Sequence, residues 1–164
     1  MKLYHGTNLI VEKPIIANRH KTLDFGTGFY TTPNEEQAQE FACKVFERRG
    51  RNSAAIVNVY EFDYAAAMRG LTVRNYLHPD EDWLKFVVHN RRYGRESDVT
   101  DLIIGPVAND DVFATITLYT IGELTIAEAI QRLKVKDLFS QYLFCNDKAL
   151  SYLSFASAYE AGAQ

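Results

Sequence analysis

Three short stretches of the chain carry residue types that could hold a small polar ligand. They are His5-Gly6-Thr7, the run from Gly28 to Thr32, and Gln141-Tyr142. The backbone groups of a glycine can pair with a carboxamide, the ring of Tyr30 can stack on a planar ring, and the amide oxygen of Gln141 can bind hydroxyl groups. The stretches are far apart in sequence, so the fold must bring them together for a site to exist.

Strands are predicted to position each of these stretches. Residues 2–7 alternate so that Leu3 and His5 share one face, residues 29–32 form a second strand entered through Gly26 and Gly28, and residues 140–144 form a late strand. Further strands are predicted at 53–63, 72–76 and 101–106, and helices at 33–50, 79–94, 110–119, 126–133 and 147–150. Residues 153–159 fit either type.

This order of elements predicts one domain over residues 1–164. Strands and helices interleave without the regular spacing of βαβ units, which favours an α+β fold with a mostly antiparallel or split sheet. A length of 164 residues fits a single core, and 47% hydrophobic residues with 10 Tyr and 10 Phe exclude a disordered chain.

The composition also argues against two classes of partner, membranes and nucleic acids. No apolar run approaches the ~20 residues of a membrane helix, so we expect a soluble cytoplasmic protein with no membrane partner. The net charge of -3 argues against a broad nucleic-acid surface, although two basic clusters could meet phosphate or could be solvated helix ends. The clusters are Lys44 with Arg48, Arg49 and Arg51, and His89 with Arg91, Arg92 and Arg95.

Other chemistries have weaker support. The histidines show no metal-ligand spacing with Cys43 or Cys145, so no metal site is predicted and both thiols are expected to be reduced. Asp24-Phe25-Gly26 lacks the companion motifs of a kinase, and Gly26-x-Gly28 lacks the third glycine of a dinucleotide turn. Trp83, Phe86, Asn90 and Arg91 could form a binding ridge, but core positions for Trp83 and Phe86 with Arg91 on the surface are preferred.

The first two stretches resemble motifs of the ADP-ribosyltransferase superfamily, in its His-Tyr-Glu branch of diphtheria-toxin-like and poly-ADP-ribose-polymerase-like enzymes. The resemblance implies a split antiparallel sheet with flanking helices and NAD, the substrate, in a cleft between two small sheets. It implies that His5 binds a ribose hydroxyl, that Gly6 holds the carboxamide and that Tyr30 stacks on nicotinamide, with Thr7 also among the NAD-binding residues. Phe41, eleven residues after Tyr30, would close the sandwich.

The third motif departs from the family. Gln141 stands where the family has its catalytic Glu, and it brings no negative charge to oppose a developing cation. The chain also resembles a bacterial family of short uncharacterised proteins, through Asp24 to Tyr30, Ile104 to Asp110 and Gln141-Tyr142, which suggests that the Gln is a family trait. In the acceptor loop before it, the resemblance implies contacts from Asp137, Phe139 and Ser140.

The resemblance implies an NAD-dependent mono-ADP-ribosyltransferase that modifies an unknown protein or nucleic-acid acceptor and releases nicotinamide. His5, Tyr30 and Gln141 would be its catalytic residues. Two alternatives are a non-catalytic module that binds NAD, ADP-ribose or a protein, and an NAD glycohydrolase with water as acceptor. A third is a toxin or phage-defence effector that acts on nucleic acid.

Overall fold

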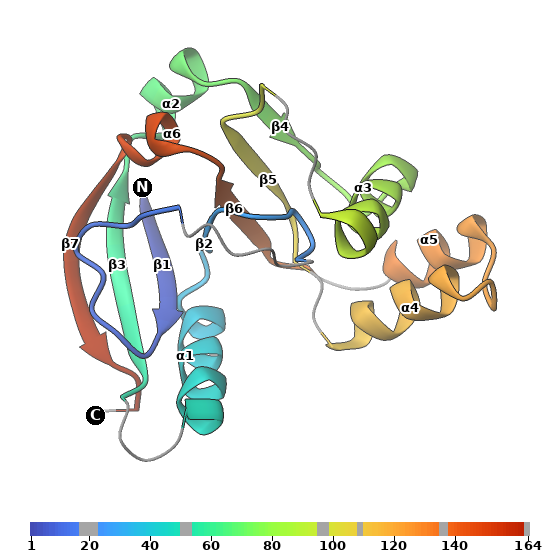
Figure 1. The fold of residues 1–164 in the computed structure, drawn as a ribbon, viewed down its shortest axis with the longest axis horizontal. Helices are drawn as coiled ribbons and strands as arrows, with labels where there is room; N and C mark the ends of the chain where they lie inside the picture. The colour runs from blue at the N-terminus through green and yellow to red at the C-terminus, as the bar shows by residue number, and fades with distance from the viewer. Residues whose placement is uncertain (17–22, 50–53, 95–98, 108–109, 135–137, 163–164) are drawn as a thin grey trace.

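The computed structural model describes residues 1–16, 23–49, 54–94, 99–107, 110–134 and 138–162. Two sheets lie side by side, with helices packed against both of them (Figure 1). The first sheet has the order β1-β3-β7, formed by Lys2–Thr7, Ile56–Phe62 and Leu153–Glu160. The second has the order β2-β6-β5-β4, formed by Phe29–Thr31, Ser140–Phe144, Leu102–Pro106 and Val73–Asn75. The predicted α+β class is confirmed.

The pairing is antiparallel throughout both sheets except between β4 and β5, which run parallel. Among the described residues, one isolated bridge connects the sheets, between Tyr4 of β1 and Thr32 just after β2. Their backbone groups exchange two hydrogen bonds, of 2.8 and 2.9 Å. Beyond this bridge β1 pairs with β3 and β2 pairs with β6, so the two strands diverge there.

Six helices occupy the described residues: α1 (Glu35–Arg49), α2 (Tyr64–Gly70), α3 (Glu81–Tyr93), α4 (Asp110–Thr120), α5 (Ile126–Lys134) and α6 (Asp147–Leu150). Helix α2 was not predicted, although Asp63 caps it by accepting a bond from the Ala66 amide at 3.0 Å. The ambiguous segment 153–159 is the strand β7. None of the described helices is long and apolar enough to cross a membrane.

Three apolar clusters hold these layers together. One fills the space between the two sheets and includes Leu3, Phe29, Tyr60, Phe62 and Phe144. A second lies between the β2-β6-β5-β4 sheet and helices α3, α4 and α5, and it contains Phe25, Trp83, Ile103, Ile116 and Leu143. The smallest lies under α1. Both sheets are therefore packed on their inner faces, and their junction at the bridge is held in place.

Helix α1 packs unusually close to β1. A Cβ at Gly6 would overlap the carbonyl oxygen of Ala38 and lie 2.8 Å from the amide nitrogen of Ala42. Ala38 and Ala42 are one turn apart and both buried, so the small residues of the helix face the glycine of the strand. Cys43, the next residue, is exposed, and the other free cysteine, Cys145, is buried.

Candidate functional site

The imidazole of His5 is held in one orientation and one tautomer. Its Nδ1 lies 2.7 Å from the carbonyl oxygen of Tyr30, and because a carbonyl can only accept, Nδ1 carries the proton and donates it. The ring of Phe29 packs against the imidazole, with centroids 4.5 Å apart and planes inclined by 36°. The neutral ring therefore presents Nε2 as a hydrogen-bond acceptor.

Burial lowers the pKa of His5 below its ordinary value of 6.5, and the hydrogen bond to the Tyr30 carbonyl offsets this only in part. His5 is consequently neutral at pH 7. A neutral Nε2 can accept a bond from a hydroxyl group, whereas a protonated Nε2 could not.

This lowered pKa makes stability depend on pH. Below pH 6.5 His5 is protonated in the unfolded chain but stays largely neutral in the folded chain, whose His5 has a lower pKa. The free energy of unfolding that His5 contributes above pH 6.5 should therefore decrease as the pH falls. Relative to His5→Phe, the wild-type free energy of unfolding should fall by up to about 1.4 kcal/mol per pH unit. Urea titrations of both proteins between pH 5 and 8 measure the difference. Parallel curves would contradict it.

Some backbone groups of β1 point to the edge where β1 and β2 separate. The backbone N–H and C=O groups of its odd-numbered residues point to β3, as the 2.7 Å bond from the Phe62 amide to the Met1 carbonyl shows. Backbone groups alternate along a strand, so those of Tyr4 and Gly6 point to the opposite edge. Tyr4 uses its groups on Thr32, and Gly6 directs its N–H and C=O to the same edge, where the strands part. One donor and one acceptor at this edge match a carboxamide.

Tyr30 is fixed by the loop that precedes it. Its hydroxyl donates to the carbonyl of Gly26 at 2.6 Å and accepts from the amide of Phe25 at 3.2 Å. Gly26 has φ 83°, a backbone conformation that favours glycine, and its amide closes a turn onto Leu23 at 3.0 Å. His5 thus reaches the main chain of Tyr30, while residues 23–28 set the position of the phenol ring.

Gln141 is the second residue of β6 and is only 9% exposed. It pairs with Gly105 of β5, and strand alternation puts its side chain on the same face as Leu143, in whose cluster Tyr30 also packs. Its Nε2 is buried and has no hydrogen-bond partner among the described residues. Because an unsatisfied buried donor is costly, this amide calls for an acceptor from a bound molecule or water.

The other predicted site residues are placed less centrally. Phe41 on α1 is 51% exposed, beside Ala42 that packs over Gly6. Thr7 ends β1 opposite Ile56. In the predicted acceptor loop, Phe139 is 51% exposed and Ser140 begins β6, whereas Asp137 lies outside the described residues. The structure therefore brings the His5 imidazole to the backbone carbonyl of Tyr30. The imidazole packs on Phe29 in the cluster between the sheets, whereas the Tyr30 ring packs in the second cluster, with Gln141 on the strand paired to β2.

Several contacts that sequence reasoning missed hold these residues. Asn58, fully buried on β3, accepts from the Val11 amide at 2.7 Å and donates to the Leu9 carbonyl at 3.0 Å, which fixes the loop after Thr7. A lone Asn within an apolar strand was the available signal. Arg91, interpreted from sequence as a surface residue, instead forms a largely buried ion pair with Asp24, while Trp83 is in the core as predicted.

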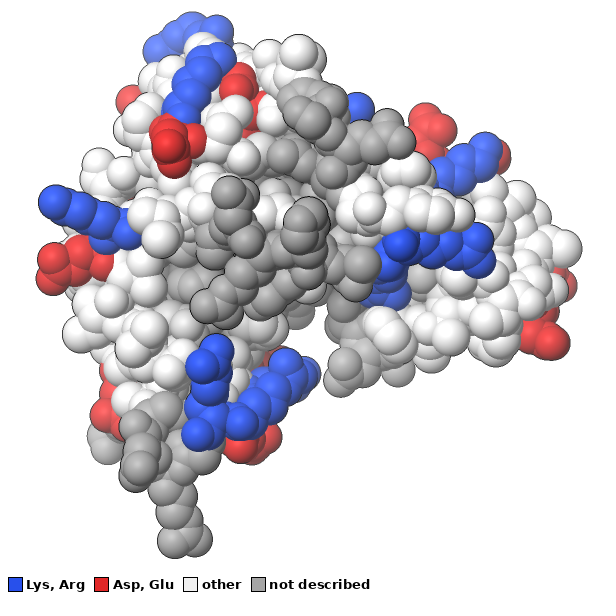
Figure 2. Space-filling view, viewed as in Figure 1, with Lys and Arg blue, Asp and Glu red and all other residues white. Residues whose placement is uncertain are grey.

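Positive charge gathers over α1 and over α3 on the face in Figure 2. On α1 it comes from the exposed side chains of Lys44, Arg48 and Arg49. Arg48 and Arg49 lie in the last turn, where cations interact favourably with the helix dipole. Arg51 and Arg95 lie outside the described residues. No group of three or more metal-ligating side chains occurs within the described part of the chain.

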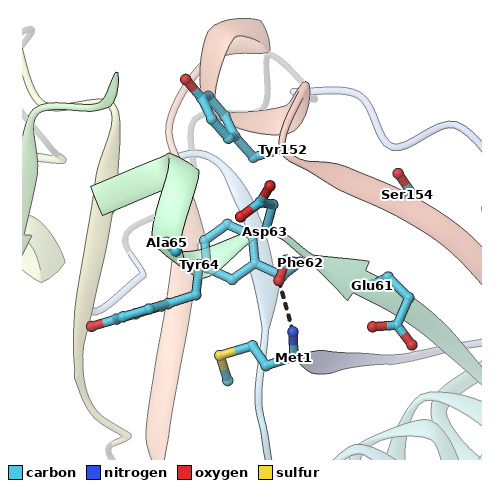
Figure 3. Close-up of a pocket in the computed structure, with 8 residues that line it drawn as sticks. All are labelled: Met1, Glu61, Phe62, Asp63, Tyr64, Ala65, Tyr152 and Ser154. Atoms are coloured by element: carbon cyan, nitrogen blue, oxygen red, sulfur yellow. Dashed lines mark hydrogen bonds between the residues drawn. The ribbon is translucent and has the colours of Figure 1, made fainter. Parts of the chain in front are cut away.

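Two surface pockets lie away from these residues. One of about 540 Å³, at the end of β3 where α2 begins, is lined by Glu61, Asp63, Tyr64 and Tyr152, with the Met1 amino group bound to the Phe62 carbonyl at 2.8 Å (Figure 3). The other, of about 560 Å³, lies beside α1 and the end of β7. Neither includes His5, Tyr30 or Gln141, so the candidate site rests on hydrogen-bond geometry and not on these cavities.

Comparison with known proteins gives one match. A family model described as "Protein of unknown function (DUF3990)" matches residues 1–155. No curated protein and no solved structure matches the chain.

Proposed function

Because the chain belongs to the DUF3990 family of proteins of unknown function, we propose an activity from the candidate site: NAD-dependent transfer of ADP-ribose to a macromolecular acceptor. The observation that carries the proposal is the bond from His5 Nδ1 to the Tyr30 carbonyl, next to the strand edge toward which Gly6 directs its backbone N–H and C=O. It joins the two motifs that resemble the ADP-ribosyltransferase signature and leaves Nε2 as an acceptor for a ribose hydroxyl.

Each residue has a defined part in this proposal. The N–H and C=O of Gly6 pair with the carboxamide of nicotinamide, and the ring of Tyr30 stacks on the pyridinium. The bond between ribose C1′ and the nicotinamide nitrogen breaks, and its electron pair leaves with nicotinamide. An acceptor oxygen or nitrogen then bonds to C1′ and loses its proton to solvent. Gln141 orients the ribose hydroxyls without adding charge.

The direct test is release of nicotinamide. The purified protein is incubated with NAD, with and without a cell extract that supplies acceptors, and free nicotinamide and labelled macromolecules are quantified. Calorimetry measures NAD binding in parallel. A protein that binds no NAD and releases no nicotinamide would refute the proposal.

Substitutions at Tyr30 separate its ring from its hydroxyl. Tyr30→Ala removes the stacking surface and should weaken NAD binding about tenfold, since aromatic pairs contribute ~0.5–1.5 kcal/mol beyond area burial. Tyr30→Phe keeps the ring and loses the bonds of the hydroxyl, among them those to Gly26 and Phe25, so its affinity should fall less. Calorimetry with NAD checks both, and equal affinity of Tyr30→Ala and the wild type would remove Tyr30 from the site.

The uncharged side chain of Gln141, whose Nε2 has no partner among the described residues, favours a second candidate, a module that binds NAD or ADP-ribose without turnover. NAD binding without nicotinamide release would identify that module. Nicotinamide release with water as the acceptor would identify an NAD glycohydrolase. Labelled nucleic acid in the extract would support the effector alternative.

A further inference from the structure

We propose that Arg91 is a positioning residue, which sets the loop that carries Tyr30 and so tunes the grip on the nicotinamide ring; this rests on the proposed function. Helix α3 lies beside the segment that leads into β2 (Figure 1). Arg91 Nε donates to Asp24 Oδ1 at 2.7 Å, and the two side chains are 18% and 17% exposed. The contact is far more enclosed than an ordinary surface ion pair.

Asn90, the residue before Arg91, also binds Asp24. Asn90, 1% exposed, donates from Nδ2 to the main-chain carbonyl of Asp24 at 2.9 Å. Consecutive residues of α3 therefore hold both the backbone and the side chain of Asp24. Two contacts at different atoms fix the orientation of a residue as well as its distance.

The far side of the loop is fixed by Tyr30 itself. The residues after Asp24 bind the Tyr30 hydroxyl through the Phe25 amide and the Gly26 carbonyl. Residues 24–26 are thus bonded to α3 at one end and to the Tyr30 hydroxyl at the other. A shift of Asp24 would move the hydroxyl's partners and, with them, the ring.

Arg91 is fixed in turn by another helix. Its guanidinium carbon lies 4.7 Å from the centre of the Phe113 ring on α4, a cation–π contact. The planar guanidinium can stack on Phe113 while its Nε binds Asp24, which a lysine could not reproduce. Within the described part of the chain, Arg91 is connected to the candidate site through Asp24, which makes it a positioning residue.

The test compares two ligands in matched variants. Arg91→Ala should lower NAD affinity about fivefold, an effect comparable to that of Tyr30→Phe and smaller than that of Tyr30→Ala, and leave ADP-ribose, which lacks nicotinamide, within about twofold. Arg91→Lys should behave like Arg91→Ala, and Asp24→Asn should add little to Arg91→Ala because the two residues act as one unit. Arg92→Ala, at the adjacent exposed residue, is the control and should change neither affinity. Equal losses for NAD and ADP-ribose would indicate a merely structural role and overturn the proposal.

Hydrogen exchange provides a readout that does not need NAD. The amides of Phe25 and Gly26 should exchange faster in Arg91→Ala than in Arg92→Ala, at equal global stability by urea unfolding. Unchanged exchange would overturn the positioning role. If the wild type binds neither ligand, the proposed function fails, and faster exchange of these two amides would still support control of the loop by Arg91.

Discussion

Replacing Gln141 with glutamate is expected to raise the rate of nicotinamide release from NAD about a hundredfold. Bond cleavage at ribose C1′ builds positive charge on the sugar, and the present side chain is a neutral amide whose Nε2 has no partner among the described residues. A carboxylate there would stabilise that charge in the transition state more than in the ground state, which is what accelerates a reaction. Single-turnover measurements of nicotinamide release report the change.

Because Gln141 is buried, the test of Gln141→Glu needs a range of pH and a control variant. A glutamate that is about 9% exposed will have a raised pKa, because burial disfavours its charged form, so the rate should be followed from pH 6 to 9 and should rise with pH. Gln141→Ala removes the amide without adding charge and should show no gain. A Gln141→Glu protein that binds NAD but releases nicotinamide no faster at any pH would show that position 141 is not aligned with the ribose.

Gly6→Ala is expected to lower the free energy of unfolding by about 3 kcal/mol, at the upper end of what overpacking costs. The added methyl group would meet backbone atoms of Ala38 and Ala42, which cannot rotate away as a side chain could. Helix α1 would have to move off β1, and the edge that Gly6 presents would move with it. Urea unfolding measures the loss.

Gly122→Ala is the matched control for this substitution. A Cβ at Gly122 meets nothing within 4 Å, but its φ of 83° makes alanine strained, so its expected cost is about 1 kcal/mol. The comparison separates a steric conflict from a conformational one. If Gly6→Ala were no less stable than Gly122→Ala, the close packing of α1 would not be the reason for a glycine at position 6.

Local patterns predicted most of the fold. The alternation in residues 2–7 and the acidic start and glycine end of α3 are signals written within a few residues, and the structure confirms them. Helix α2 was missed because its seven residues are too few for a periodic apolar face, and a cap followed by alanines is a weak signal. The parallel pairing of β4 with β5 depends on contacts across the sheet, which no local pattern contains.

The candidate site also has a part that local patterns predicted and a part that they did not. His5, Gly6, Tyr30 and Gln141 were identifiable because motifs place them on strands. The Asp24–Arg91 pair was not, because the partners are 67 residues apart and opposite charges on a surface are common. The tautomer of His5 likewise depends on a carbonyl 25 residues away, which no local sequence pattern identifies.

The strand order has a consequence for biosynthesis. Strand β2, which carries Tyr30, pairs with β6 at residues 140–144, and β3 is flanked by β7 at residues 153–160. Both sheets therefore combine early and late parts of the chain. A nascent polypeptide cannot complete either sheet until the ribosome has translated these late strands, so β2 and β3 each lack one neighbouring strand until residues 140–160 have been made.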